Sequence, residues 1–406
     1  MTVASLEAEP ACPEPAVVPE QSGGRRLRVE RRRFDSVARE TWDGLAAAQT
    51  WATPFSAWAF HRAWWDAYGG NAHDETLLVL DAAGAPVGIA PFMHRHQVEP
   101  EDEATHTTLR HGHAIELTPV PAEAKTIFFG ASYHADYATL LAAPADLPDV
   151  AEAVVAHLAD EAAVDPHHPA RWDVVDLRRL RCGDPAGDEL AAAFGRREVA
   201  SGWTLNVERE DVCPVVTLPV GADLDGFLAT LRKKDRHETR RKVRRAEAAG
   251  PVRLIDSADP VADLDAFIEL HQRRWGADGL FPPTSGGAQS RLLFRRLFEL
   301  FGSDGPLRLT FLTVDGRRIA AGVHFETADS YLYYNAGVDP DARDLSPGVV
   351  MAERYVRRAL ANGIRRLDFL RGDEPYKYEW GARDEPIIRI LVRRADASPA
   401  ARSRSA

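Results

Sequence analysis

The densest group of polar and aromatic side chains in the sequence lies in the segment DFLRGDEPYKYEWG, at residues 368–381. The segment follows a predicted strand, and a loop beyond the carboxyl end of a strand is a common place for a binding or catalytic site. It brings together an acid, a lysine, two phenols, a guanidinium and an indole, at Asp373, Lys377, Tyr376, Tyr378, Arg371 and Trp380. We therefore take this segment as the first candidate for an active site.

A second group with acid-base potential lies in the predicted strand IAAGVHFE, at residues 319–326. Side chains alternate between the faces of a strand, so the apolar residues share one face while His324 and Glu326 share the other. The pair is a candidate general base, and a solvated strand face explains the pattern equally well. His271 falls among apolar residues at helical spacing in the predicted helix 260–275, which favours a packed core histidine over a base.

An anion site is predicted where a strand and a turn lead into a helix, in YNAGVDPDARDLSPGVVM at residues 334–351. Unpaired N–H groups and the helix dipole both favour an anion at such a turn. The candidate contacts in the turn and in the first turn of the helix are Arg343, Ser346, Gly348 and Val349. Asn335 shares a face of the preceding strand with Tyr331 and Tyr333, which is a candidate lining of a ligand channel or ordinary strand packing. The alternative is an ordinary turn in which Ser346 caps the helix and Pro347 follows it.

The predicted helix 230–249 carries nine Arg or Lys residues against three acids, in a chain whose formal net charge is −11. A solvated charged helix is the simpler interpretation. The other is a basic face for an anionic substrate, a sugar nucleotide or tRNA, to which Arg240 and Arg244 would contribute. The acidic balance of the whole chain argues against nucleic-acid or anionic-membrane binding over its entire surface.

The predicted elements occur twice in the same order, which indicates an internal repeat of an α+β unit. Each copy has a helical start, a hairpin, a strand, a helix and a last strand. In the first copy these are 54–70, 77–93 with its turn at Asp81 to Gly84, 136–142, 146–163 and 172–177. In the second they are 260–277 with 288–302, 307–326 with its turn at Asp315 and Gly316, 331–338, 347–362 and 365–370. An insertion in the first copy is placed in 96–130.

Motifs and element order together resemble the GNAT acyltransferases. Arg343-x-x-Ser346-x-Gly348 is similar to the pyrophosphate loop of that family, with serine in place of its first glycine. GDEPYKYEWG, RRWG at 273–276 and the basic segment after 230 resemble the BioF2-like or CelD/BcsL group, which is associated with cellulose or exopolysaccharide biosynthesis. The double layout and the lysine motif also resemble, more distantly, the FemABX peptidyltransferases, which use aminoacyl-tRNA. The likeness covers about residues 50–395 and is strongest in 225–385.

The resemblance implies tandem GNAT-like domains of the α+β class, each with a mixed, mostly antiparallel twisted sheet flanked by helices. Acetyl-CoA or another acyl-CoA would bind the second copy, with its pyrophosphate on 343–348 and its thioester between the strands 331–338 and 366–370. The acceptor would enter between the copies. The corresponding junction of the first copy, LLAAPADLPDVAEAV, has neither a glycine nor a basic residue, so we expect no CoA there.

The same resemblance assigns roles in acyl transfer. An amine or hydroxyl would attack the thioester carbonyl, with Asp373 or Glu326 as base, Lys377 as the electrostatic donor and Tyr376 or Tyr378 as acid. The acceptor would be a small amine or a saccharide-linked molecule, and an anionic one if the basic helix takes part. A FemABX-like aminoacyl transferase and a binding module without catalysis are the alternatives.

Length and composition favour two domains in an ordinary globular protein, with 406 residues of which 45% are hydrophobic and 27% charged. We expect an N-terminal domain at 25–205 and a C-terminal domain at 206–395, between disordered tails at 1–24 and 396–406. No apolar run approaches the length of a membrane span, and the acidic start does not resemble a signal peptide, so we expect a cytoplasmic protein. The three scattered cysteines give no indication of a metal site.

Overall fold

The structure is a computed structural model, and it describes residues 25–95, 106–108, 114–121, 123–165 and 168–395. The tails predicted at 1–24 and 396–406 lie outside the described residues, as does part of the insertion predicted in 96–130. Within the described part, no helix has the length and apolar character needed to cross a bilayer.

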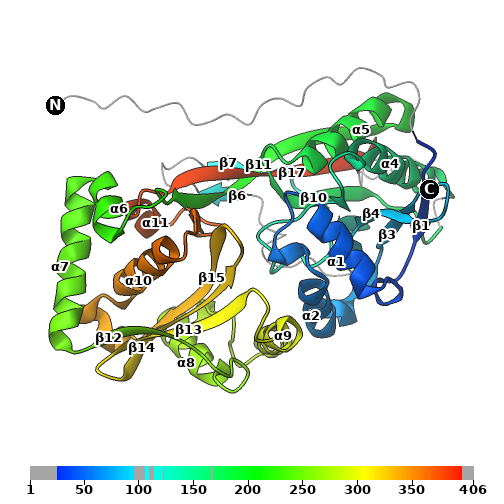
Figure 1. Cartoon of the computed structure of the whole chain (residues 1–406). Coiled ribbons are helices and arrows are strands. Elements are labelled where there is room, and N and C mark those ends of the chain that lie inside the picture. The colour runs from blue at the N-terminus through cyan, green and yellow to red at the C-terminus, as the bar shows by residue number, and fades with distance from the viewer. Residues whose placement is uncertain (1–24, 96–105, 109–113, 122, 166–167, 396–406) are drawn as a thin grey trace.

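One long mixed sheet runs through both halves of the molecule (Figure 1), in the strand order β12-β13-β14-β15-β16-β11-β17-β10-β8-β5-β2. The strands of its C-terminal part are β12 (Val252–Asp256), β13 (Leu307–Val314), β14 (Arg317–Glu326), β15 (Ser330–Val338) and β16 (Arg366–Asp368). The two long central strands are β11 (Trp203–Thr217) and β17 (Arg383–Arg394). The strands of its N-terminal part are β10 (Val174–Arg181), β8 (Thr126–Phe129), β5 (Phe92–Arg95) and β2 (Ala72–Asp74).

Two smaller sheets complete the β structure of the described residues. The first contains β1 (Arg28–Arg31), β3 (Leu77–Leu80), β4 (Pro86–Ala90) and β9 (Leu141–Ala142), and the second pairs β6 (His106–Thr108) with β7 (Ala114–Glu116). The β3-β4 hairpin turns at the predicted place, because Asp81 Oδ1 accepts hydrogen bonds from the backbone of Ala83 and Ala85 and Gly84 adopts the left-handed φ of 83° that the turn requires.

Helices cover both faces of the sheet. Those of the N-terminal half are α1 (Arg39–Ala48), α2 (Trp58–Tyr68), α4 (Leu147–Ala163) and α5 (Pro185–Ser201). Those of the C-terminal half are α6 (Leu224–Thr230), α7 (Lys233–Ala249), α8 (Leu264–Trp275), α9 (Ser285–Phe301), α10 (Pro347–Ala361) and the short α11 (Pro375–Glu379). Short 3-10 turns lie at Phe34–Ser36, Pro54–Ser56, Gly69–Asn71, Gly276–Asp278 (η4) and Pro340–Leu345 (η5).

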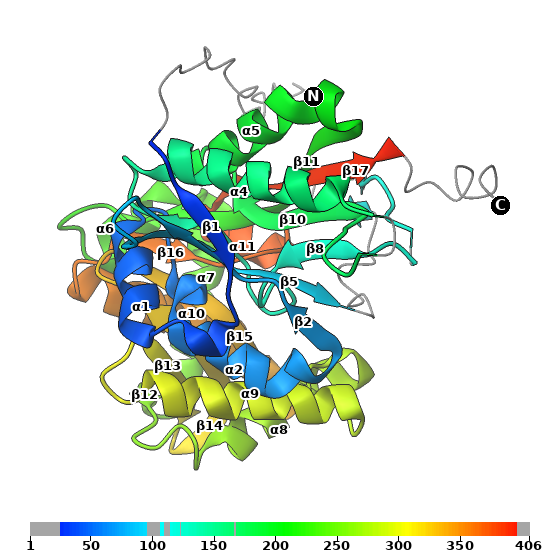
Figure 2. The ribbon, with the colours of Figure 1, turned by 90° about the vertical axis from the view of Figure 1, so that its right-hand side faces the viewer.

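Apolar packing divides these helices between the faces. The apolar side chains of α8 and α9 pack with α2 on one face, and those of α6, α7 and α10 pack on the other. Figure 2 shows α4 and α5 over the N-terminal part of the sheet and α2 beside α9. The contact between α2 and α9 joins the two halves through a shared core.

The predicted repeat is visible in the two parallel strand pairs. In the C-terminal half β15 leads through α10 to β16, which pairs with it in parallel, and in the N-terminal half β8 leads through α4 to β10 in the same way. One strand was predicted wrongly: 136–142 forms only the two-residue β9, and the strand that corresponds to β15 is β8. The reason is that the buried TIFF of β8, not the polar-interrupted DYATLLA, supplies a continuous apolar run for the centre of the sheet.

The central strands β11 and β17 join the halves. β11 runs without a break through 203–217 and pairs with β16 at one end and with β17 along most of its length. The sequence placed a domain boundary in this region, and that division stays a prediction. Because β17 lies between β11 and β10, this strand, the last one in the described residues, completes the sheet of both halves.

Candidate active site

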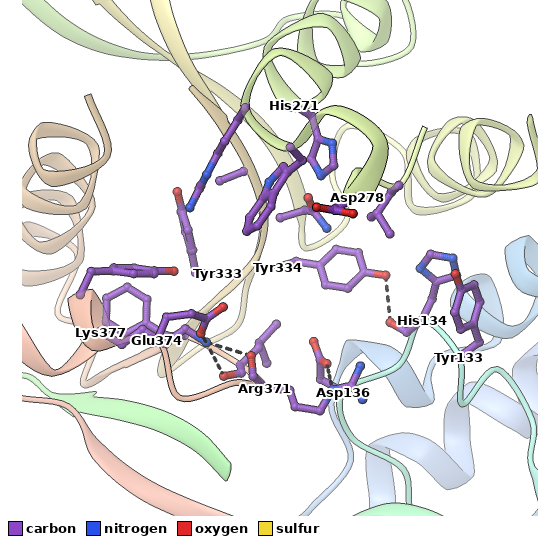
Figure 3. Close-up of a pocket in the computed structure, with 18 residues that line it drawn as sticks. Tyr133, His134, Asp136, His271, Asp278, Tyr333, Tyr334, Arg371, Glu374 and Lys377 are labelled. Carbon is purple, nitrogen blue, oxygen red and sulfur yellow. Dashed lines mark hydrogen bonds and ion pairs between the residues drawn. The ribbon is translucent and has the colours of Figure 1, made fainter. Parts of the chain in front are cut away.

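A cavity of about 320 Å³ lies where β15 diverges from the chain that follows β16. The two strands pair only from Ser330 to Leu332 on β15, so the backbone of β15 beyond Leu332 has no strand partner on that side. Figure 3 shows the cavity with the side chains that line it. They come from three regions: Tyr133, His134 and Asp136; His271, Arg274, Trp275, Asp278 and Leu280; and Tyr333, Tyr334, Asn335, Ala336, Phe369, Leu370, Arg371, Glu374, Tyr376 and Lys377.

Lys377 holds the chain that borders the cavity after β16. Its side chain is buried (2% exposed), and Nζ donates to the carbonyl oxygens of Leu370 (3.1 Å), Arg371 (2.8 Å) and Gly372 (2.9 Å). Nζ also lies 2.9 Å from Glu374 Oε2. The ammonium is thus surrounded by protein acceptors, which favours a positioning role for the lysine over direct donation to a substrate.

The turn that Lys377 holds is conformationally demanding. Leu370 has a φ of 56° and Gly372 a φ of 101°, and the first of these is uncommon for a residue with a side chain. Asp368 Oδ1 accepts from the backbone N–H of Leu370 (2.8 Å), while Tyr137 from the N-terminal half donates to Asp368 Oδ2 (2.8 Å). Burial raises the pKa of Asp368 to about 6. An ionisable carboxylate and a lysine therefore fix this turn from opposite sides.

The N-terminal half supplies one wall of the cavity. Asp136 Oδ1 lies 3.3 Å from Arg371 Nε, and Tyr334 donates to the carbonyl oxygen of His134 (2.9 Å). Behind the wall, the Tyr68 hydroxyl contacts His134 Nε2 at 2.8 Å. The predicted acceptor route between the copies requires a cavity that both halves line, and this cavity meets that requirement.

The end of α8 and the turn after it form the opposite wall. His271 is 3% exposed, and burial lowers its pKa to about 4, so the imidazole is neutral at pH 7. The backbone of α8 at His271 lies very close to β15 at Gly337. Only glycine fits at position 337, because a Cβ there would lie 2.3 Å from the backbone N of His271. His271 packs against Phe281, as expected of a core histidine, and it also borders the cavity.

Two phenols of the cavity hold their protons strongly. Burial raises the pKa of Tyr333 to about 12, with Arg274 acting in the opposite direction. Burial also raises the pKa of Tyr376, with smaller contributions from Tyr333 and Glu374. Both hydroxyls are therefore protonated at neutral pH, as a general acid must be.

The structure places three of the other residues of the 368–381 segment away from the cavity. The Tyr378 hydroxyl donates to Asp384 Oδ1 at 2.6 Å, and Trp380 is packed in the core beneath α6 and α10. Asp373 is half-buried, and burial raises its pKa, but it does not line the cavity. The sequence also predicted three residues of this segment that do line the cavity: Arg371, Tyr376 and Lys377.

His324 and Glu326 form the pair that strand alternation predicted, with Nε2 3.0 Å from Oε1. The imidazole is fully buried, and its Nδ1 contacts the Tyr355 hydroxyl of α10 at 3.0 Å. Burial lowers the pKa of His324. Because the pair packs against α10 and does not line the cavity, its geometry favours a structural role over that of the base.

The predicted anion turn stands at the start of α10. Ser346 has a φ of 53° and makes no side-chain cap to the helix, and its Oγ accepts instead from Arg245 Nη2 of α7 (2.8 Å). Gly348 and Arg343 are exposed, and a Cβ on Gly348 would meet no atom within 4 Å. The side-chain cap is thus not what forms: the N–H groups of Val349 and Val350 donate to the carbonyl oxygen of Ser346, and the Arg245 guanidinium bonds to the Ser346 hydroxyl.

Helix α7 buries one narrow stripe, made by Asp235, Thr239, Val243 and Ala246. Most of its basic side chains point outward, and Arg240 forms an ion pair with Asp225 (2.7 Å). Arg240 and Arg244 line a second cavity, of about 270 Å³, between α6, α7 and α10. These two residues are therefore separate from the first cavity.

No cluster of histidine, cysteine or carboxylate side chains suited to a metal ion occurs in the described ranges. Residues 233–378 match the family described as acetyltransferase (GNAT) domain. The solved structure of FemX superimposes with a TM-score of 0.52 at 11% identity, over 87% of this chain and 96% of FemX. No curated protein matches the chain.

Two further solved structures are similar. A conserved protein of unknown function from Bacteroides thetaiotaomicron has a TM-score of 0.48 at 12% identity, over 88% of this chain and 97% of its own. A tandem GNAT protein from the clavulanic acid biosynthesis pathway has a TM-score of 0.42 at 14% identity, over 92% and 99%. The α+β, GNAT-like fold predicted from the sequence is confirmed, whereas the narrower BioF2-like or CelD/BcsL assignment stays a prediction.

Sequence reasoning missed most of the cavity. Tyr133, His134 and Asp136 lie in a loop with no motif, and their role depends on the contact between the halves. Arg274 and Trp275 were recognised only as part of RRWG, without a function. Asp278, three residues after Trp275 in RRWGADG, also lines the cavity and was not recognised from the sequence.

Proposed function

We propose that this chain transfers an acyl group from an acyl-CoA to an amine or hydroxyl acceptor in the cavity between its halves. The observation that supports the proposal most is the divergence of β15 from β16, which frees a strand edge directly beside a cavity. A free edge can pair with the amide groups of an extended ligand, and pantetheine is such a ligand. The GNAT-like fold and the family match are consistent with acyl transfer.

The CoA pyrophosphate would lie at the start of α10. The N–H of Gly348 and the positive end of the helix dipole favour an anion, and Arg245 and Arg343 add positive charge. Gly348 leaves room for close approach of a phosphate to the backbone. From there pantetheine would follow β15 past Asn335 to bring the thioester into the cavity.

The reaction releases one proton overall. The acceptor ammonium loses a proton to become nucleophilic, and its nitrogen forms a bond to the thioester carbonyl carbon. The carbon–sulfur bond then breaks, the nitrogen loses a second proton, and the departing thiolate takes one proton to give CoA. We assign proton donation to the thiolate to Tyr376 and proton acceptance to His271, since both line the cavity in the required protonation states.

These assignments differ from those that the resemblance implied. Asp373 and Glu326 do not line the cavity, so neither is proposed as base. Lys377 does line it, but its ammonium already binds three carbonyl oxygens, so we propose that it positions Arg371 and the adjacent backbone. We propose that Arg371, which lines the cavity, contacts the acceptor.

Titration calorimetry with acetyl-CoA and longer acyl-CoAs, followed by a CoA-release assay, tests the proposal. Gly348→Trp and Arg245→Glu should each weaken acyl-CoA binding about tenfold or more, because they obstruct the turn or reverse its charge. Arg241→Glu is the matched control on α7, since Arg241 is exposed and bonds only to Glu238. Unchanged affinity in both turn variants would remove the turn from the donor site.

An aminoacyl-tRNA donor is the second candidate, and the basic face of α7 favours it. Lys233, Lys234, Lys242 and Arg244 form no ion pair with any residue that the structure describes. In that case charged tRNA would raise the melting temperature and acyl-CoA would not. A stabilisation by acyl-CoA alone would instead leave α7 as a solvated helix.

A further inference from the structure

The cavity contains three cations and three carboxylates, and four of these charges are satisfied within the protein. Arg371 pairs with Asp136 and Lys377 pairs with Glu374. The two that remain are Arg274, in the last turn of α8, and Asp278, the last residue of η4, and both are exposed at the edge of the cavity. Neither forms an ion pair or a side-chain hydrogen bond with any residue of the described ranges.

The two charges border the same cavity, at the end of α8 and in η4. Arg274 lowers the pKa of Tyr333, of Tyr376 and of His271, so its guanidinium acts on all three of these cavity residues. Its guanidinium also lies 4.5 Å from the Trp275 ring centre, which fixes its direction. In Figure 3 Asp278 lies on the His271 side of the cavity, with Tyr334 between it and the side of Arg371 and Glu374.

An acyl-CoA offers no charged group that could pair with Arg274 or Asp278 in the cavity. Its phosphates would be at the start of α10, and its pantetheine and thioester carry no charge that could meet a carboxylate or a guanidinium. A simple amine would pair with Asp278 but would leave Arg274, which is exposed at the edge of the cavity, without an anionic partner. A molecule with one carboxylate and one ammonium matches both charges, because a guanidinium binds a carboxylate with two parallel hydrogen bonds.

We infer that the acceptor is an amino acid or a related small molecule that carries both an amine and a carboxylate. Arg274 binds the carboxylate, and Asp278 receives the ammonium beside His271, which takes the proton before the nitrogen attacks. The atoms balance as in the transfer above, with an N-acyl amino acid, CoA and one proton as products. This inference rests on the proposed function, and it names the acceptor of the same cavity.

Steady-state kinetics with matched acceptors test it, with acetyl-CoA as donor and CoA release as the signal. The pairs are phenylalanine with phenethylamine and lysine with cadaverine, which differ in the carboxylate alone, together with a series from glycine to 6-aminohexanoate. Wild type should acylate the carboxylate-bearing partner of a pair with a kcat/KM about ten- to a hundredfold higher, the usual effect of one charge-assisted contact. The series separates an α-amine from a more distant amine as the group that is acylated.

Variants of Arg274 and Asp278 test whether these two side chains bind the carboxylate and the ammonium of the acceptor. Arg274→Gln should lower kcat/KM for the amino acids about ten- to a hundredfold and leave the matched amines within about threefold, and Arg274→Lys should restore part of the loss. Asp278→Asn should raise KM for both members of each pair. Arg273→Gln is the matched control, because Arg273 pairs with Asp339 and Asp341 and does not line the cavity.

Three outcomes are distinguishable. A carboxylate preference that Arg274→Gln abolishes supports the inference. Equal activity on amines and amino acids, or equal losses on both in Arg274→Gln, overturns it and leaves acyl transfer intact. If no acyl-CoA binds and no acceptor releases CoA, the proposed function fails and the inference fails with it.

Discussion

Replacing Lys377 by methionine separates a positioning lysine from a catalytic one. The side chain is buried, and its ammonium donates to the carbonyl oxygens of Leu370, Arg371 and Gly372. Methionine retains most of the apolar stem and removes all of these bonds. We expect the variant to be less stable than wild type and also less active, because the turn that borders the cavity loses its support.

The magnitude follows from the acceptors left behind. A buried acceptor without a partner costs about 1 to 3 kcal/mol, and removal of the charged partner is offset in part because the lysine no longer needs to be desolvated. For three carbonyl groups we expect a net loss of about 3 kcal/mol in the free energy of unfolding. Glu374→Gln is the control: Glu374 is 49% exposed, so loss of its charge should cost about 1 kcal/mol or less.

Urea unfolding followed by circular dichroism measures the stability of both variants, and the CoA-release assay measures kcat on the same preparations. A positioning role predicts that stability and kcat fall together in Lys377→Met and that both stay near wild type in Glu374→Gln. A Lys377→Met variant within about 0.5 kcal/mol of wild type, with kcat lowered a hundredfold or more, would refute this reasoning and return the ammonium to the reacting atoms.

Further predictions concern the walls of the cavity. Gly337→Ala should destabilise the chain and weaken acceptor binding, because its Cβ would clash with the backbone of His271, and urea unfolding with KM measures both. Tyr376→Phe should fold normally and lose about tenfold or more in kcat, whereas unchanged kcat would exclude it as the acid. Asp368 has a raised pKa of about 6, so its protonated form adds about 2 kcal/mol of stability at pH 4 that is lost as pH rises through 6. Asp368→Asn should remove this dependence in urea titrations between pH 4 and 8. The pKa of His271 is lowered to about 4, so its effect on stability has the opposite pH dependence. The free energy of unfolding should fall by about 2 kcal/mol as pH is lowered from 6.5 to 5, and by less in His271→Gln.

The elements with strong local signals were predictable. Apolar periodicity and glycine stops located α4, α9 and α10 closely, and the turns at Gly84 and Gly316 were found because only a residue tolerant of positive φ fits there. The junction of turn and helix at the start of α10 was likewise located from the element order, and its role as a pyrophosphate site stays a prediction. What these have in common is that a short stretch of sequence determines the feature.

Features that depend on distant contacts were not predictable. β17 was not recognised as the strand that joins both halves, because its place between β11 and β10 depends on partners about 200 residues away. Asp136 became a cavity residue only through Arg371 of the other half. Lys377 was recognised by its motif, but a motif does not show that its ammonium is already occupied by carbonyl oxygens.

Hydrogen–deuterium exchange with and without saturating acyl-CoA tests the central claim most directly, because it locates the ligand on the backbone. We predict protection of β15 beyond Leu332 and of the first turn of α10, where freed or uncapped N–H groups would meet pantetheine and pyrophosphate. The corresponding junction of the first copy, at the start of α4, should show no change. Protection at α4 in place of α10, or no protection at β15 while calorimetry shows saturated binding, would contradict the account.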